Sequence, residues 1–224
     1  MLKFRSLEKE ILDGNNYSKE ELFQNLKELE IINSKLGGNK INKKGFQYLS
    51  KNKEQLRVLE VGCGGGDNLS FLQKKFPNNQ FYGSDINPYC IEYSNKNRKA
   101  NLEFFLQDAF ELTEKYDIIY NSLFCHHFSD DELVIHIKKL YQLSNLGLFI
   151  NDLERNPIAY YSIKFLSKIF SKSRLVKNDA PLSVKRGFKK REWEVILKKA
   201  GITNYKIKWC WAFRWLIIIP NESK

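Results

Sequence analysis

The feature that most constrains the fold is a regular alternation of short apolar segments with amphipathic segments between residues 56 and 151. The amphipathic segments carry apolar residues at helical spacing, as in residues 69–76 and 130–143. Strands that alternate with helices in this way predict a parallel sheet with helices on both of its faces. The apolar segments predicted as strands are residues 56–61, 81–86, 102–106, 116–123 and 147–151.

The chain on either side of this region has different patterns. Before it, apolar residues recur every three or four positions from Leu22 to Ile32, behind a capping box that starts at Ser18, and predict a helix. A second helix is predicted through residues 46–49. After it, residues 158–172 predict a basic amphipathic helix that a polar loop follows.

The last part of the chain is predicted to hold one more helix and a strand pair. Residues 189–200 have a helical pattern that ends at Gly201. Two apolar stretches follow, residues 202–212 and 214–219, with too few residues between them for a crossover helix. We therefore expect them to form an antiparallel hairpin.

A glycine cluster follows the first predicted strand, in the order Glu60-Val61-Gly62-Cys63-Gly64-Gly65-Gly66-Asp67. Glycine suits a sharp turn and a place where a ligand lies directly against the backbone, and open parallel sheets bind ligands at the carboxyl ends of their strands. A dinucleotide site would have glycine in place of Asp67, whose charge opposes a phosphate. The Gly-Lys-Ser or Gly-Lys-Thr of a phosphate loop is also missing. We therefore expect a ligand that is uncharged or cationic at this end.

The cluster fits the pattern Glu-x-Gly-x-Gly-x-Gly, and further segments follow it in order: Gly83-Ser84-Asp85-Ile86-Asn87, Gln107-Asp108-Ala109 and the strand at 116–122. With these segments the chain resembles the class I S-adenosylmethionine-dependent methyltransferases from Leu56 onward. The resemblance implies S-adenosyl-L-methionine as the cofactor and S-adenosyl-L-homocysteine as its product.

The resemblance also implies roles for single residues. Asp85 would accept hydrogen bonds from the ribose hydroxyls, Ile86 would lie against the adenine, and Asp108 would receive the adenine amino group. The full set of expected cofactor-binding residues is Glu60, Gly62, Cys63, Gly64, Asp85, Ile86, Asp108, Ala109 and Asn121.

The fold that the resemblance implies is an α/β fold. It is a Rossmann-like seven-stranded methyltransferase sheet, mostly parallel with an antiparallel terminal strand, and it carries an N-terminal helical lid. We expect residues 1–55 to form the lid and residues 56–224 the methyltransferase domain, with a basic amphipathic lid insert at about 155–180.

Two adjacent histidines, His126 and His127, follow the fourth predicted strand. A hydroxyl that accepts a methyl group must lose its proton, and the ordinary histidine pKa near ~6.5 suits a base at neutral pH. The pair also resembles a Leu-His-His-Leu segment of small-molecule methyltransferases, including those of quinone biosynthesis. We predict both as catalytic; the alternative is that they orient a loop or the cofactor. His136, in a charged helix, is expected at the surface.

The acceptor is expected to meet Phe124, Arg155, Tyr160 and Tyr161. The last three belong to the insert after the fifth strand, which in this family often covers the acceptor. The aromatic residues would form a wall and Arg155 could hold a carboxylate; the alternative is that the aromatic residues are the packing face of a helix. The sequence after the fourth strand also lacks the Asn-Pro-Pro-Tyr of amide and exocyclic-amine methylases, which argues against a DNA-adenine or protein-glutamine target.

The net charge and the cysteines limit which binding partners and which cellular compartment are expected. The net charge is +11, and residues 154–224 hold 17 Lys and Arg against 5 Asp and Glu. This excess suits nucleic acid, a membrane surface or an acidic ligand, or it is solubilising surface charge. The four cysteines are scattered without a CxxC pair, and the first residues lack a secretion signal, so we expect free thiols, no metal site and a cytoplasmic protein.

The predicted function is therefore transfer of a methyl group to a small aromatic or lipophilic acceptor, by O-methylation of a hydroxyl. A loose similarity of residues 29–38 and 151–155 to a bacterial subgroup points to secondary metabolism. Two enzyme alternatives remain open: an RNA methyltransferase that uses the basic C-terminal third, and a C-methyltransferase of a quinone precursor. Peripheral membrane contact through the basic helix is a further possibility.

Overall fold

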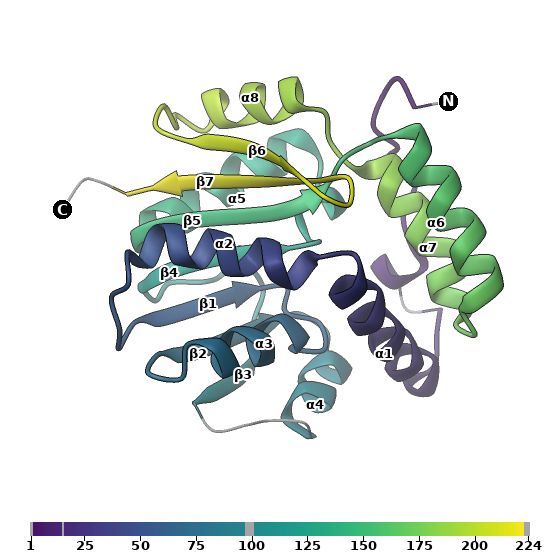
Figure 1. Ribbon diagram of the computed structural model, residues 1–224, viewed down its shortest axis with the longest axis horizontal. Coiled ribbons are helices and arrows are strands. Elements are labelled where there is room, and N and C mark those ends of the chain that lie inside the picture. Colours follow the sequence, from purple (N-terminus) through teal and green to yellow (C-terminus); the bar gives the residue numbers. More distant parts are fainter. Residues whose placement is uncertain (1, 15, 97–100, 222–224) are drawn as a thin grey trace.

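The five apolar segments of the central region form strands, and the C-terminal strand pair joins them in one sheet (Figure 1). The computed structural model describes residues 2–14, 16–96 and 101–221. The strands are β1 (Arg57–Val61), β2 (Gln80–Asp85), β3 (Leu102–Leu106), β4 (Tyr116–Ser122), β5 (Ser144–Leu153), β6 (Lys206–Cys210) and β7 (Arg214–Pro220). Their order across the sheet is β3-β2-β1-β4-β5-β7-β6, and β7 runs antiparallel to both β5 and β6 while the other pairs are parallel. The predicted fold class is confirmed.

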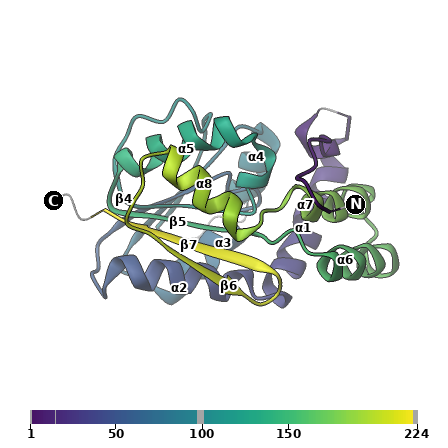
Figure 2. The same ribbon diagram turned by 90° about the horizontal axis from the view of Figure 1, so that it is seen from above.

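Helices cover both faces of this sheet (Figure 2). Helices α2 and α3 pack on one face, α5 and α8 on the other, and α4 lies beside β2 and β3. Helices α1, α6 and α7 lie together beyond the carboxyl ends of the parallel strands. The bounds are α1 (Lys19–Lys35), α2 (Gly38–Ser50), α3 (Asp67–Lys75), α4 (Pro88–Lys96), α5 (Asp130–Leu143), α6 (Pro157–Phe170), α7 (Arg174–Arg186) and α8 (Lys190–Lys199), with the short 3-10 helices η1 (Ile11–Asp13) and η2 (Cys125–His127).

The apolar residues of each central strand alternate between two cores. In β4, Ile118 packs toward α2 and α3, and Ile119 packs toward α5 and α8. In β5, Leu148 packs toward α5 and α8, and Phe149 packs toward α2 and α3. All four side chains are fully buried. Because successive strand residues point to opposite faces, continuous apolar strands can fill both cores.

Helix α2 packs on one face of the sheet, although the sequence placed it in the N-terminal lid. Its Gly45 faces Phe149 so closely that an added Cβ would lie 2.6 Å from the ring. The ring of Phe149 in turn stacks on Tyr120 at 4.6 Å between centroids. The helical cover over the carboxyl ends of the strands is therefore made by residues 2–14 and 16–35 together with α6 and α7.

The polar loop predicted after residue 172 is wrong, because the structure has helix α7 there. The side chain of Ser173 caps its first turn by accepting a hydrogen bond from the backbone N–H of Val176. Pro181 lies inside the helix. Leu175, Val176 and Val184 are buried, so tertiary packing outweighs the weak helical propensity of the segment.

The antiparallel hairpin of β6 and β7 is confirmed, although β6 is shorter than the stretch predicted for it. The tryptophans of this segment differ in their exposure. Trp215 is buried, whereas Trp209 and Trp211 are 45% and 68% exposed. The four cysteines are free and buried. Among the described residues, no helix is both long and apolar enough to cross a membrane.

Replacing Gly45 by alanine tests the contact between α2 and the sheet. Alanine is the better helix former by about 1 kcal/mol, but its methyl group would collide with a ring that cannot move away. We expect Gly45→Ala to lower the free energy of unfolding by about 1–2 kcal/mol, measured by denaturant titration. Gln47→Ala, on the exposed side of the same helix, is the control and should change it little. A Gly45→Ala protein more stable than the wild type would contradict this packing.

Candidate active site

Strand β1 ends in a loop that presents bare backbone at the carboxyl edge of the sheet. Gly62 and Gly64 have φ angles of 74° and 51°, in the left-handed region that favours glycine. A Cβ on Gly62 would lie 2.1 Å from the ring of Phe124, so this position cannot carry a side chain. The backbone N–H groups of Gly62 and Cys63 donate to the Ser84 carbonyl oxygen, which fixes the loop against β2.

Asp85, at the end of β2, faces this loop with its carboxylate. Its Oδ2 accepts a hydrogen bond from the Gly64 N–H at 2.9 Å, and its Oδ1 accepts one from the Asn87 N–H at 2.9 Å. Burial raises the pKa of Asp85 above its ordinary value. The glycine loop therefore holds in place an acceptor whose remaining lone pairs point at the cleft beside it.

A cleft of about 1090 Å³ opens in front of the loop, which is the upper end of the size of ligand sites. Helix α1 and residues 6–14 form the wall opposite the sheet. Six of the nine expected cofactor-binding residues line this cleft: Gly62, Gly64, Asp85, Ile86, Asp108 and Ala109.

The other three, Glu60, Cys63 and Asn121, do not line the cleft. Glu60 is fully buried and accepts hydrogen bonds from Asn68 Nδ2 at 2.9 Å and from the Tyr120 hydroxyl at 3.0 Å. Burial raises its pKa well above the ordinary value. Asn121 donates to the Val61 carbonyl oxygen at 2.8 Å. Glu60 and Asn121 thus tie α3 and β4 to the glycine loop from behind, and Cys63 packs in the core.

His126 is paired with a buried aspartate that the sequence analysis did not assign. Its Nδ1 lies 2.7 Å from Oδ1 of Asp152, and its backbone N–H donates to Oδ2 of the same carboxylate. Burial would raise the pKa of Asp152, but the charge and hydrogen bonding of His126 keep it below the ordinary value. Because an ionised carboxylate can only accept, Nδ1 carries the proton and Nε2 is left as a proton acceptor. A carboxylate that orients a histidine in this way is the arrangement of a general base.

Glu10, from the segment before α1, reaches the other side of this histidine. Its Oε1 lies 3.7 Å from His126 Nε2 and accepts a hydrogen bond from the Ser183 hydroxyl at 2.8 Å. Burial raises the pKa of Glu10 to about 7. No sequence signal could have found Glu10, because a charged residue of an amphipathic N-terminus has no feature that distinguishes it. Asp152 could have been found, since it follows a strand whose carboxyl end lies at the same edge.

His127 is held by a second carboxylate of the same segment. Its Nδ1 lies 2.5 Å from Oδ1 of Asp13, whose Oδ2 is bound by Arg186. Burial alone would raise the pKa of Asp13, but His127 and Arg186 lower it below its ordinary value. Arg186 also donates to the carbonyl oxygens of His126 and His127. Residues 10–13 and α7 therefore hold the histidine pair in position.

The predicted acceptor residues separate into two groups. Phe124 lines the cleft together with Phe110 and Phe128. Arg155 is directed away from it: the guanidinium is 1% exposed and binds the Gly187 carbonyl oxygen and Glu192. Tyr160 is buried in a separate cluster, and Tyr161 is 61% exposed. The predicted contact between the acceptor and Arg155, Tyr160 or Tyr161 is not what the structure shows, because Arg155 is bound by Gly187 and Glu192 and α6 turns the two tyrosines elsewhere.

His136 lies inside the protein, which corrects its expected surface position. It is fully buried, stacked on Phe128, with Nε2 3.3 Å from Asn121 Oδ1. Burial lowers its pKa to about 4, so it remains neutral. The charges around it in the sequence belong to the other faces of α5.

One group of residues has the composition of a metal site. Ligand atoms of Glu10, His126 and His127 lie within 4.8 Å of one another. Arg186 already brings a positive charge to within 3.9 Å of Glu10, and His126 Nδ1 is taken by Asp152. These neighbours provide the charge balance that a cation would supply.

Comparison with known proteins agrees with this geometry. Residues 58–147 match a family described as "Methyltransferase domain". The chain is 31% identical over 104 residues to malonyl-[acyl-carrier protein] O-methyltransferase 1 of Ilyobacter polytropus, a match that covers 45% of this chain and 38% of the relative. It is 33% identical over 109 residues to the release factor glutamine methyltransferase of Streptococcus pneumoniae, covering 46% and 39%. The chain thus spans well under half the length of these relatives.

Solved structures resemble the chain over most of its length. The plantazolicin methyltransferase BpumL in complex with SAH superposes with a TM-score of 0.69 at 18% identity, covering 91% of this chain and 95% of that one. Human N-acetylserotonin methyltransferase in complex with SAM gives 0.68 at 15% identity, covering 91% and 56%. These likenesses show the fold. The domain match over residues 58–147 agrees with the fold of the class I S-adenosylmethionine-dependent methyltransferases, and with the expectations of an enzyme and of that cofactor.

Substitution of Asp85 tests the cofactor side of the cleft. Asp85→Asn keeps the shape but removes the charge, and a hydrogen bond to a charged group contributes about 1.5–3 kcal/mol. We expect the affinity for S-adenosyl-L-homocysteine to fall by about tenfold or more in calorimetric titration. Asp131→Asn removes a carboxylate that is 91% exposed and serves as the control. Equal affinities of wild type and Asp85→Asn would show that the nucleoside lies elsewhere.

The raised pKa of Glu10 predicts a pH dependence of stability. The folded state holds this proton more tightly than the unfolded state, so its contribution is complete below about pH 4.5 and is lost as the pH rises through about 7. The loss is about 3 kcal/mol. Glu10→Gln cannot ionise, so its free energy of unfolding relative to wild type should rise between pH 5 and pH 8 in denaturant titrations.

The exposed Glu8 supplies the control, since Glu8→Gln should show no such trend. A difference between Glu10→Gln and wild type that stays constant with pH would mean that Glu10 is not desolvated.

Proposed function

We propose that this protein transfers the methyl group of S-adenosylmethionine to a hydroxyl of a small aromatic or lipophilic acceptor. The observation that carries the proposal is that the Asp85 carboxylate and the His126–Asp152 pair open into one cleft. A nucleoside site alone would suit many binding proteins. A base beside it suits the removal of a proton from an acceptor.

The cofactor side of the cleft is assigned as follows. Asp85 accepts hydrogen bonds from the two ribose hydroxyls, and Ile86 lies against the adenine. Asp108 receives the adenine amino group; its own Oδ1 already accepts the Phe110 N–H at 2.7 Å, which fixes the carboxylate in direction. The bare backbone at Gly64, where an added Cβ would meet only Leu26 at 3.7 Å, leaves room for the methionine part of the cofactor.

The acceptor side uses the histidine for one proton transfer. Bound S-adenosylmethionine would supply an activated methyl group, which the acceptor oxygen would take while the sulfonium would leave as a neutral thioether. His126 Nε2 takes the hydroxyl proton, and the Asp152 carboxylate stabilises the imidazolium that forms. The donor is already activated, so the remaining work of the protein is to align the two reactants and to exclude water. Residues 6–14 and α1 provide the cover.

The aromatic rings beside the base support the acceptor class. Phe110, Phe124 and Phe128 form edge-to-face pairs at 5.5 and 5.0 Å on the cleft wall, a surface that suits a flat or lipophilic molecule. Two of the similar proteins are named for a small molecule or a carrier-bound acid, the plantazolicin methyltransferase and the malonyl-[acyl-carrier protein] O-methyltransferase. Their names support the same class of acceptor. The four free cysteines support a cytoplasmic location.

Two other acceptors remain as alternatives, a quinone precursor and RNA, and they place different demands on the site. C-methylation of a quinone precursor uses an acceptor whose carbon is already nucleophilic, so it depends less on a base. RNA methylation would draw on the basic C-terminal third. The cover formed by residues 6–14 and α1 over the cleft favours a small acceptor, because a polynucleotide needs an open path to the methyl group. Asn121-Ser122-Leu123-Phe124 also gives no support to a glutamine target.

Substitutions of the base pair test this mechanism. We expect His126→Ala to lower kcat by about 10²–10⁴-fold and to leave the affinity for S-adenosylhomocysteine unchanged. Asp152→Asn should lower kcat and shift the pH profile, because the amide no longer fixes the tautomer. The assay is transfer of a labelled methyl group to phenols, quinone precursors, hydroxy fatty acids and RNA.

His127→Ala is the comparison variant, since the Nδ1 of its side chain is bound to Asp13 and it is expected to affect kcat less. Full activity in both His126→Ala and Asp152→Asn would rule out the base. Transfer to RNA alone would overturn the small-molecule acceptor.

A further inference from the structure

Helix α6 turns an apolar face to solvent. Six of its large apolar side chains are 39–76% exposed: Ile158, Tyr161, Phe165, Leu166, Ile169 and Phe170. The spacing of 158, 161, 165 and 169 places these four on one stripe of the helix. The buried side of the helix is a different one, which includes Ala159, Tyr160 and Ser167. The alternative prediction that the aromatic residues of this segment form the packing face of a helix therefore does not account for the exposed ones.

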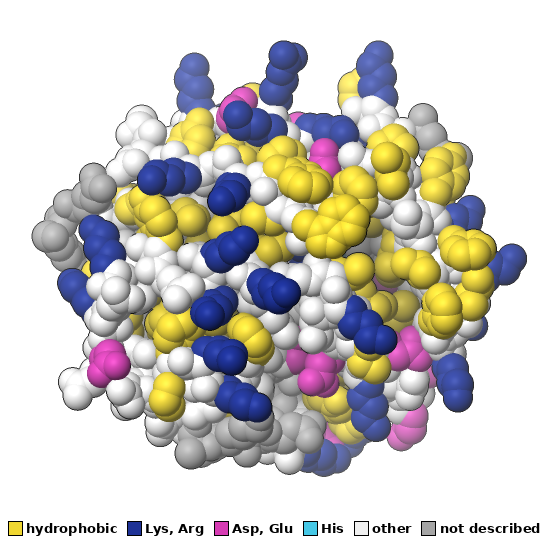
Figure 3. Space-filling view, viewed as in Figure 1, with side chains coloured by type: hydrophobic (Ala, Val, Ile, Leu, Met, Phe, Trp, Pro, Cys, Tyr) yellow, Lys and Arg dark blue, Asp and Glu magenta, His cyan; other side chains and the backbone are white. Residues whose placement is uncertain are grey.

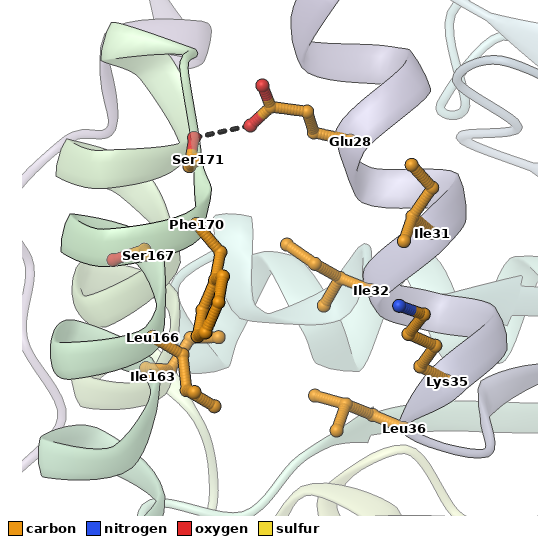
Figure 4. Close-up of a pocket in the computed structure, with 10 residues that line it drawn as sticks. All are labelled: Glu28, Ile31, Ile32, Lys35, Leu36, Ile163, Leu166, Ser167, Phe170 and Ser171. Carbon is orange, nitrogen blue, oxygen red and sulfur yellow. Dashed lines mark hydrogen bonds between the residues drawn. The ribbon is translucent and has the colours of Figure 1, made fainter.

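An apolar groove continues this face toward α1 (Figure 4). The groove has a volume of about 240 Å³. Ile31, Ile32 and Leu36 of α1 face it from one side, and α6 faces it from the other with Ile163, Leu166 and Phe170. A hydrogen bond from the Ser171 hydroxyl to Glu28 closes one end.

The turn between β6 and β7 extends the same surface. The Ala212 N–H donates to the Leu36 carbonyl oxygen at 3.2 Å, so the turn lies against the end of α1. Beside it, Trp211 is 68% exposed. Figure 3 shows hydrophobic side chains gathered over this side of the molecule, with lysine and arginine around them. We call α6, the groove and Trp211 the docking face.

The charges of the docking face are mostly positive, with Glu28 as the acidic residue of the groove. The sequence of α6 contains no Asp or Glu, and Lys164, Lys168 and the following Lys172 are exposed. Lys35 stands at the groove. The carboxylate of Glu28 is engaged by Ser171 and by the backbone N–H groups of residues 172 and 173. A helix with an exposed apolar stripe and flanking lysines has the composition of one that lies in a membrane interface.

We propose that the docking face seats this protein on a membrane surface that carries anionic lipids. The apolar stripe and Trp211 enter the boundary between headgroups and acyl chains, and the lysines meet lipid phosphates. A second copy of the chain fits less well, because a twofold contact would bring the lysines of two α6 helices together without an acidic partner on either. None of the residues of the docking face lines the cofactor cleft, so the proposal stands apart from the proposed reaction.

Cosedimentation with vesicles tests the docking face directly. The full chain is mixed with phosphatidylcholine vesicles, with and without about one third phosphatidylglycerol. We expect binding to the anionic vesicles that is at least about tenfold stronger than to the neutral ones and that weakens as salt is raised. The double variant Phe165→Ser/Ile169→Ser should lose binding by about tenfold for each side chain.

A second variant tests the charges. Lys164→Gln/Lys168→Gln should weaken binding to anionic vesicles by about fivefold for each lysine. Two matched controls lie on the other side of the molecule: Ile135→Ser, 61% exposed on α5, and Lys199→Gln on α8. Both should bind as the wild type does. All substituted side chains are exposed, and unchanged thermal unfolding confirms that each variant folds.

Three results would overturn the proposal: no binding to either vesicle, equal binding to both, or wild-type binding by Phe165→Ser/Ile169→Ser. A dimer in light scattering that this variant dissolves, without vesicle binding, would assign the face to a second copy instead. S-adenosylhomocysteine affinity is measured in parallel and should be the same in all variants. If the wild type does not bind S-adenosylhomocysteine, the proposed reaction is contradicted, and the result on membrane binding is unaffected.

Discussion

The lack of a side chain at Gly62 is the constraint on which the rest of the site depends. The space that its Cβ would need is filled by the ring of Phe124, which follows β4. This contact brings the end of β4 against the loop after β1, and the same loop binds Asp85 through the Gly64 N–H. The carboxyl ends of three neighbouring strands, β2, β1 and β4, thereby meet at one cleft, as expected of an open parallel sheet.

The N-terminal segment completes this cleft from outside the sheet. Glu10 and Asp13 each place a carboxylate beside one histidine of the pair, and Arg186 of α7 binds the backbone of both histidines. Buried charges are stable only when they are paired and hydrogen-bonded. The arrangement therefore couples the position of the two histidines to the packing of residues 10–13 and of α7. The cover over the cleft and the chemistry inside it are parts of one network.

The fold could be predicted from the sequence, and so could most of the residues that line the cleft at the ends of β1 and β2, because both depend on local signals. Glycines that must adopt positive φ, and an acid directly after a strand such as Asp85, are visible without any long-range contact. The failures share one cause, which is that tertiary packing decided the outcome. A polar loop was expected after residue 172, yet the burial of Leu175 and Val184 makes α7 a helix. His136 is buried among aromatic rings, Arg155 is held by Glu192, and Glu10 reaches the site through folding alone.

The central claim is that a sulfonium nucleoside lies on the bare backbone of the glycine loop with its sugar at Asp85. A crystal structure of the protein with S-adenosylhomocysteine tests it most directly. The account predicts that the ligand spans the cleft, with the ribose hydroxyls within hydrogen-bond distance of the Asp85 carboxylate and the sulfur directed toward His126. A cleft without ligand at saturating concentration, or a ligand bound away from Gly62 and Gly64, would contradict it.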